Sequence, residues 1–181
     1  MFRSANGRGP NMWVLSRSPE ETARGVFAAI ADRDLPAIAG YLAGDDVQVF
    51  VPVGRFEGRD AIVAFFAQLF AAFPDLVTIV EDVRVSGAYV AVRWRLRGTF
   101  TGNTFQGIAA TGRRLEIEGV DAFVEVRDGL IVRNTIFYDG AAFLRGAGVL
   151  PERGSGAEAA LLTLFNTWTW VRRKLLDRIP L

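Results

Sequence analysis

Four consecutive segments between residues 76 and 138 place apolar residues at every second position, which is the period of a β-strand with one buried face. Turn residues separate the segments, so we expect hairpins to connect them. In the second segment the apolar residues share one face and Arg93, Arg95 and Arg97 share the other, which predicts a solvated or subunit-facing side. The predicted strands cover 76–85, 89–100, 115–126 and 130–138.

Apolar residues at helical spacing precede these strands. Ser18, Pro19 and Glu21 form a capping signal that begins a first helix. Pro74 ends a helix that is apolar on nearly every side, which is typical of a core helix. The other predicted elements are a short helix over 35–42 and a short strand over 47–51, followed by a turn. This order predicts an α+β fold in which a strongly bent, mostly antiparallel sheet wraps around helices and encloses a pocket.

The length of 181 residues, half of them hydrophobic, suits one domain with tails. We expect a flexible arm over 1–17, the domain over 18–151 and an amphipathic helical extension over 152–181. The net charge of +1 gives no broad field to attract nucleic acid, so no nucleic-acid partner is expected. The arginines near the N-terminus lack a long apolar run beside them, so we predict a cytoplasmic protein without a secretory signal.

The chain contains neither cysteine nor histidine. Their absence excludes disulfides, thiolate nucleophiles and catalysis by a Ser-His-Asp or Cys-His arrangement. It also removes the most common general base and metal ligand, so we expect no metal and no cofactor. Any proton chemistry must then depend on carboxylates.

Three segments carry a resemblance to a known family: AAFPDLVTIVEDVRVSGAYVAVRWRLRGTFTG, GIAATGRRLEIEGVDAF and VRDGLIVRNTIFYDGAAFLRGAGVLP. Over residues 23–151 the chain resembles the SnoaL-like, or polyketide cyclase-like, branch of the nuclear transport factor 2 and ketosteroid isomerase superfamily. The resemblance implies a cone-shaped fold and a homodimer. It leaves the reaction open, because this superfamily includes isomerases, cyclases, epoxide hydrolases, dehydratases and proteins without catalysis.

Asp121 is the first candidate for a catalytic residue. It alternates with Leu115, Ile117, Gly119 and Phe123 on one face of its predicted strand. If that face is concave, burial favours the neutral carboxyl group, which can donate a proton at neutral pH. The resemblance also places Asp121 at the position of the protonated aspartate of ketosteroid isomerase. The alternative is a bulge at Gly119 that turns Asp121 outward.

Several positions depart from the relatives' catalytic patterns. Val51 stands where the resemblance places the basic aspartate of ketosteroid isomerase, and Val26 stands near its tyrosine. Ile136 replaces the aspartate of the epoxide hydrolases, and Asn134-Thr135-Ile136 replaces the His-Trp-Asp run of many cyclase-like relatives. These departures disfavour steroid isomerisation and epoxide hydrolysis.

The remaining candidates would bind the substrate. Asn134 and Tyr138 share a strand face and could orient a carbonyl group, or could pair with the protein itself. Gln48 and Gln106 are further polar candidates for the cavity, whereas Asp139 fits a helix cap better than a catalytic acid. Aromatic residues could form a slot for a polycyclic ligand, or could simply be core. The aromatic residues considered are Trp94, Phe65, Phe66, Phe70, Phe123 and Phe137.

The C-terminal extension carries an apolar stripe at helical spacing that includes Leu161, Leu164, Trp168 and Val171, beside four basic residues. We expect the stripe to dock on the domain or on a second subunit. Contact with an anionic membrane, or closure over the pocket as a lid, is possible but not favoured.

Taken together, these observations favour a cofactor-free acid/base enzyme of the cyclase or isomerase kind. Its predicted ligand is an apolar carbonyl-containing small molecule, such as a polyketide or a steroid-like ring. Asp121 would act as acid, or as acid and base in turn. The alternative is a module of the same fold that binds a hydrophobic ligand or a partner without catalysis.

Overall fold

A computed structural model describes residues 17–51 and 53–176. Two helices come first, and a third follows the first two strands. Four further strands and two more helices complete the order, which is the predicted one apart from one added strand. The elements are α1 (Pro19–Ala31), α2 (Leu35–Ala39), β1 (Leu42–Val51), β2 (Gly54–Glu57), α3 (Arg59–Ala72), β3 (Val77–Ser86), β4 (Tyr89–Thr99), β5 (Arg114–Arg127), β6 (Leu130–Tyr138), α4 (Gly140–Gly146) and α5 (Gly156–Leu176).

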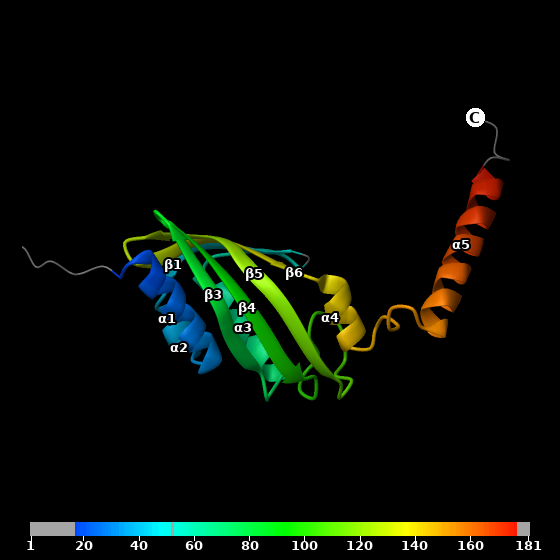
Figure 1. The fold of residues 1–181 in the computed structure, drawn as a ribbon, viewed down its shortest axis with the longest axis horizontal. Helices are drawn as coiled ribbons and strands as arrows, with labels where there is room; N and C mark the ends of the chain where they lie inside the picture. Colours follow the sequence, from blue (N-terminus) through cyan, green and yellow to red (C-terminus); the bar gives the residue numbers. More distant parts are fainter. Residues whose placement is uncertain (1–16, 52, 177–181) are drawn as a thin grey trace, which may run out of the picture.

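The strands form one six-stranded sheet in the order β2-β1-β6-β5-β4-β3. Only β1 and β6 pair in parallel among the described strands, and every other neighbouring pair is antiparallel. Among the helices, α1 contacts β3, β4 and β5, whereas α3 contacts β1 and β2, and Figure 1 shows α5 standing apart from the sheet. The α+β fold with a mostly antiparallel sheet is confirmed.

The helices begin where their capping residues predict. At α1 the Ser18 hydroxyl accepts a hydrogen bond from the backbone N–H of Glu21, and the Glu21 carboxylate accepts one from the N–H of Ser18. This reciprocal pair satisfies two N–H groups that a helix start otherwise leaves unpaired. In α3, the buried residues recur at spacings of three and four and share one face, whereas Ala61, Ala64, Gln68 and Ala71 are exposed, so the expectation of a helix covered on nearly every side was wrong. The buried residues of α3 are Ile62, Phe65, Phe66, Leu69, Phe70 and Ala72.

Two predictions for residues 35–57 were wrong. The second helix was expected to extend through Leu42, but it ends at Ala39 and Leu42 is the first residue of β1. The turn predicted over 52–55 was too long, because residues 54–57 form β2, which pairs with β1 at the edge of the sheet. Its side chains are exposed or half-buried, so it lacks the alternation by which a strand is detected.

The sheet contains a bulge next to the first candidate residue. Val90 pairs with Val124 and Val92 pairs with Asp121, so β5 has one residue more than β4 over this stretch. The bulge therefore lies after Asp121, and the expected alternative of a bulge at Gly119 was wrong. Asp121 remains in phase with the buried residues before it and faces inward.

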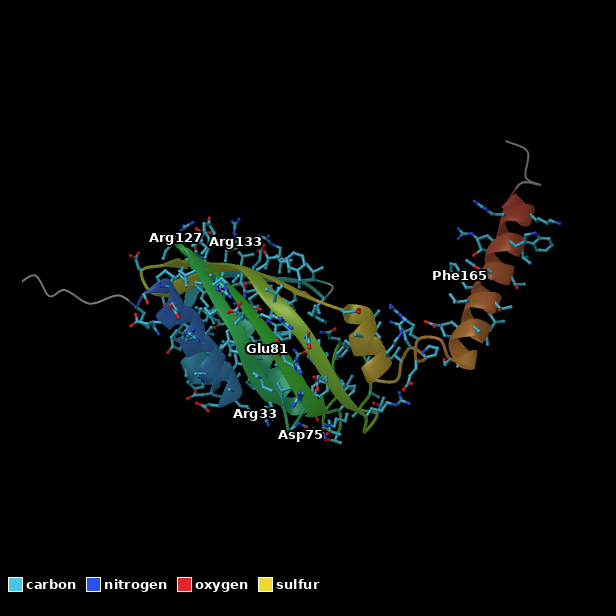
Figure 2. All side chains as sticks on the ribbon, viewed as in Figure 1. Arg33, Asp75, Glu81, Arg127, Arg133 and Phe165 are labelled. Carbon is cyan, nitrogen blue, oxygen red and sulfur yellow. The ribbon has the colours of Figure 1, made fainter. Side chains whose placement is uncertain are left out.

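The outer face of the sheet carries a network of ion pairs. Arg95 contacts three carboxylates, those of Glu81, Glu116 and Glu118, at 2.7–2.9 Å. The two neighbouring arginines extend the network to the same glutamates, and Figure 2 shows Glu81 over this face. The arginine row is therefore a solvated, paired surface in this chain, and the homodimer implied by the resemblance remains a prediction.

The extension forms α5, which does not dock on the domain in this structure (Figure 1). The Ser155 hydroxyl accepts from the N–H of Glu158, whereas the Glu158 carboxylate accepts from Gly154 rather than from the cap residue. The capping box that Ser155 and Glu158 could form is thus only half formed. No helix in the described ranges is long and apolar enough to cross a membrane.

Candidate functional site

A cavity of about 100 Å³ lies between the helices and the inner face of the sheet. Its walls are mostly apolar and aromatic, with Phe27 from α1, Phe65 and Phe66 from α3 and Trp94 from β4. Ligand sites in proteins are typically of this kind, apolar with a few polar groups in fixed positions. The polar residues on these walls are Gln48, Thr78, Asp121, Asn134 and Tyr138.

Asp121 is held from both sides within this cavity wall. The indole Nε1–H of Trp94, on β4, donates to its Oδ1 at 2.7 Å, and the Nδ2–H of Asn134, on β6, donates to its Oδ2 at 2.6 Å. Because β4 and β6 flank β5, the sheet itself brings the two donors to the carboxylate. The sequence placed Asp121 and Asn134 in the cavity but did not predict that they bond to each other.

Burial raises the pKa of Asp121 to about 6, and the hydrogen bonds from Asn134 and Trp94 partly oppose this rise because they favour the charged form. Both contacts are donors to oxygen, as an ionised carboxylate requires. The carboxyl group therefore exchanges its proton much closer to neutral pH than an exposed aspartate does. The rise of the pKa has the direction predicted from burial, and the two donors equip the ionised carboxylate to act as a base.

Gly119 makes room for the indole ring. A Cβ at this position would lie 2.3 Å from Cζ2 of Trp94 and 2.8 Å from the carbonyl oxygen of Phe137. Gly119 and Trp94 are paired positions on β5 and β4, so the ring lies directly across the glycine. The glycine thus acts through close packing, and it fixes the donor that holds Asp121.

A second buried acid lies beside the cavity. The Nε2–H of Gln48 donates to Oδ2 of Asp46 at 3.1 Å, and burial raises the pKa of Asp46 to about 6. Gln48 on β1 is the paired neighbour of Asn134 on β6. The sequence prediction missed Asp46, although it alternates with Gln48 and Phe50 on the buried face of β1.

Two buried oxygen atoms on the cavity wall lack a hydrogen-bond partner within the described part of the chain. They are Oδ1 of Asn134 and Oγ1 of Thr78. Thr78, which was not predicted, lies on β3, three strands away from β6. Buried polar atoms are rarely left unpaired, so each is suited to accept a hydrogen bond from a ligand.

Tyr138 lies half-buried in the cavity wall, where burial raises the pKa of its phenol although a hydrogen bond with Gln106 lowers it. The phenol is therefore neutral at physiological pH and can donate a hydrogen bond.

The other candidates lie elsewhere or have structural roles. Phe137 is exposed, so its inclusion in an aromatic slot was wrong, and Phe70 is in the core away from the cavity wall. Asp139 caps α4, since its Oδ1 accepts from the N–H groups of Ala141 and Ala142. Phe123 belongs to β5, but its side chain lies outside what the structure describes.

The replaced catalytic positions differ in where they lie. Val26 and Ile136 line the cavity, whereas Val51 is exposed at the end of β1. Over residues 17–51 and 53–176, no group of three or more carboxylate side chains is placed to hold a metal ion. Asp121 is thus the one carboxylate among the described residues of the cavity wall.

The family model for SnoaL-like polyketide cyclase matches residues 21–146. A proposed SnoaL-like polyketide cyclase from Jannaschia sp. CCS1 is 25% identical, with a TM-score of 0.67 over 79% of this chain and 100% of its own. IdmH, a proposed polyketide cyclase from Streptomyces antibioticus, is 28% identical, with a TM-score of 0.63 over 73% of this chain and 99% of its own.

AclR, a proposed hydroxylase from Streptomyces galilaeus, shares the fold, with 22% identity and a TM-score of 0.66 over 85% of this chain and 96% of its own. A search of curated proteins finds no match to this chain.

Proposed function

The chain belongs to the SnoaL-like polyketide cyclase family, and on that basis we propose that it closes a carbon ring in a polyketide-like substrate with Asp121 as general base. The observation that carries the proposal is the geometry of Asp121. Its carboxylate is buried in an apolar cavity, both oxygens accept hydrogen bonds from neutral donors, and its pKa is about 6. A carboxylate in such surroundings is a stronger base than one in water.

The substrate class follows from what such a base can deprotonate. A methylene group between two carbonyl groups is an acidic C–H group, and polyketides contain this unit repeatedly. Asp121 would take one proton from that carbon, and the resulting enolate carbon would attack a second carbonyl carbon of the same molecule. The new C–C bond leaves an alkoxide, which recovers the proton from Asp121. The cycle is balanced and requires no cofactor.

Neighbouring polar groups support this chemistry. The Tyr138 hydroxyl and the Gln48 amide line the cavity and can donate hydrogen bonds to an enolate oxygen, which stabilises the charge that develops in the transition state. The unpaired oxygens of Asn134 and Thr78 suit hydroxyl groups on the substrate. Aromatic walls suit a flat ring system that packs against them.

The test is the variant Asp121→Asn with a linear polyketide ester that carries a 1,3-dicarbonyl unit. General base catalysis contributes about 10²- to 10⁴-fold, so we expect cyclisation to slow by at least roughly 100-fold. Asp82→Asn is the matched control, because Asp82 is an exposed acid bonded to Arg84. Cyclisation by Asp121→Asn at the rate of the control would refute the role of Asp121.

Binding without turnover is the second candidate function. It is favoured by two observations: Asp121 and Asn134 already pair with each other, and the cavity position where the resemblance places a polar group holds the apolar Ile136. Exchange of the probe's methylene protons in D₂O separates the two candidates. A catalytic base accelerates this exchange through Asp121, whereas a binding module shows saturable binding without faster exchange.

A further inference from the structure

The longest helix, α5, exposes an apolar face. Leu164, Phe165 and Trp168 are 70%, 60% and 58% exposed, and Leu161 is also exposed. Positions three or four apart lie on one side of a helix, so these side chains form a continuous stripe. Figure 2 shows Phe165 well away from the sheet. An exposed stripe of this kind marks an interaction surface.

The charges of α5 are concentrated at one end. Its only acidic residue in the sequence, Glu158, lies in the first turn and bonds to Arg145 and to the N–H of Gly154. The opposite end has three consecutive basic residues, from Arg172 to Lys174, with no acid between Glu158 and Leu176, and Asp177 follows outside the described residues. That end suits a partner with negative charge.

The basic side chains accompany tryptophans. The Arg172 guanidinium lies 5.3 Å from the centre of the Trp168 ring, and the Lys174 ammonium lies 4.0 Å from the centre of the Trp170 ring. All four side chains have an apolar body and a polar tip, which is the character of residues that concentrate between lipid headgroups and acyl chains.

A second copy of α5 fits this surface less well. Leu161, Leu164, Trp168 and Val171 have the alternating spacing of three and four that a coiled coil requires. However, the flanking positions contain Arg172 and Lys174 and no acid, so two parallel helices would bring like charges together. Leu162 and Trp170 are exposed outside the stripe and would remain so in such a pair.

We propose that α5 binds to the surface of an anionic lipid bilayer, with its apolar stripe in the headgroup and acyl boundary and its basic end against the lipid phosphates. The helix would lie along the surface, and the cavity would stay outside the bilayer. The proposal stands independently of Asp121 and its chemistry.

The experiment uses the full chain and vesicles of phosphatidylcholine, with or without 30% phosphatidylglycerol. Co-sedimentation and tryptophan emission report binding. We expect at least about tenfold tighter binding to the anionic vesicles, with a blue shift in emission and weakening by salt. Failure to bind the anionic vesicles, or equal binding to both kinds, would overturn the proposal.

Matched variants locate the surface. Leu164→Asn with Phe165→Asn should abolish binding, whereas Thr163→Asn with Thr167→Asn places the same side chains on the opposite face and should retain it. Charge reversal at Arg172, Arg173 and Lys174 should remove the preference for anionic lipid. Circular dichroism verifies that each variant keeps its helix. If light scattering instead shows a dimer that Leu164→Asn with Phe165→Asn dissociates, and lipid binding is absent, the occupant is a second copy and the proposal is wrong.

Discussion

At the residue scale, the protonation of Asp121 reflects two opposed effects. Burial disfavours the carboxylate, and the N–H groups of Trp94 and Asn134 stabilise it, which leaves a pKa of about 6. A base with that pKa is ionised at neutral pH and still basic enough to accept a proton from carbon. The pH dependence of the reaction should therefore rise through about pH 6.

Trp94→Phe tests the contribution of the indole N–H. The ring that packs against Gly119 is partly retained, but the hydrogen bond to Oδ1 is lost. A hydrogen bond to a charged group is worth about 1.5–3 kcal/mol, so the pKa of Asp121 should rise by about one to two units. The midpoint of the pH–rate profile should move upward accordingly. A midpoint that stays near the wild-type value would show that the indole N–H does not stabilise the carboxylate.

Stability should depend on the same proton. The folded-state pKa of Asp121, about 6, lies above the ordinary aspartate value of about 3.9, so the folded state holds this proton more tightly. Its contribution to stability is fully present below about pH 4 and is lost as the pH rises through about 6. The loss amounts to about 3 kcal/mol for two pKa units. The contribution of Asp46 to stability should also be lost as the pH rises, because burial raises its pKa as well.

Chemical denaturation of the wild type and of Asp121→Asn at pH 4, 5, 6 and 7 isolates this effect. Acids with a lowered pKa, such as Asp75 and Asp139, alter the unfolding free energy of both proteins equally, so their effect cancels in the difference. As the pH rises, the unfolding free energy of the wild type should fall relative to that of Asp121→Asn. A difference independent of pH would mean that Asp121 titrates alike in the folded and unfolded chain.

Gly119→Ala tests whether the indole is held by packing. The added methyl group would overlap the Trp94 ring, so the ring must move and its hydrogen bond to Asp121 should weaken. We expect the midpoint of the pH–rate profile to move upward, as for Trp94→Phe, which lowers activity near neutral pH, with a change in tryptophan fluorescence. Ala122→Gly is a control on the same strand. Wild-type activity in Gly119→Ala would show that the ring position is not required.

At the scale of elements, the sequence predicted the strands best. The predicted bounds of β3 to β6 lie within one residue of those observed, because a sheet with one buried face imposes alternation along each strand. The edge strand β2 lacks that signal. Asp46 was missed because an acid on an inward face contradicts the hydrophobic pattern, although the alternation around it is intact.

The candidate site could be predicted only in part. Alternation placed Asp121 and Asn134 inward, but their mutual hydrogen bond depends on the register between β5 and β6. Register and the bulge after Asp121 are set by packing across strands, which one strand's sequence does not encode. The upward direction of the pKa shift follows from burial and was predicted, whereas the two donors that oppose it depend on those contacts and were not.

The capping box of α1 gives a prediction for one element. Ser18→Ala removes an acceptor for the Glu21 N–H, and N-cap losses typically cost about 1 kcal/mol. Ser155→Ala removes the corresponding cap of α5, which lies apart from the core. We expect Ser18→Ala to lower the domain's unfolding free energy and Ser155→Ala to leave it unchanged. Equal effects on both would show that α5 contributes to the same folding unit.

At the scale of the whole molecule, the core does not include the C-terminal extension. The buried core extends from Ala23 to Ala147, and the family match covers nearly the same residues, 21–146. A chain that ends at Pro151 therefore keeps the core and the cavity walls. A loss of 1 kcal/mol in unfolding free energy shifts the melting temperature by about 2–4 °C in a protein of this size. We therefore expect the melting temperature of the chain that ends at Pro151 to differ from that of the full chain by less than about 2 °C.

The truncated chain also separates the two proposals made for this protein. It should retain the chemistry of Asp121, because every cavity residue lies before Gly146, and it should lose binding to anionic vesicles, because α5 is absent. Calorimetry, cyclisation and co-sedimentation measure the three quantities on one sample. A drop of several degrees would mean that the apolar stripe of α5 packs on the domain in solution. In that case the stripe would be part of the fold and could not bind lipid without partial unfolding.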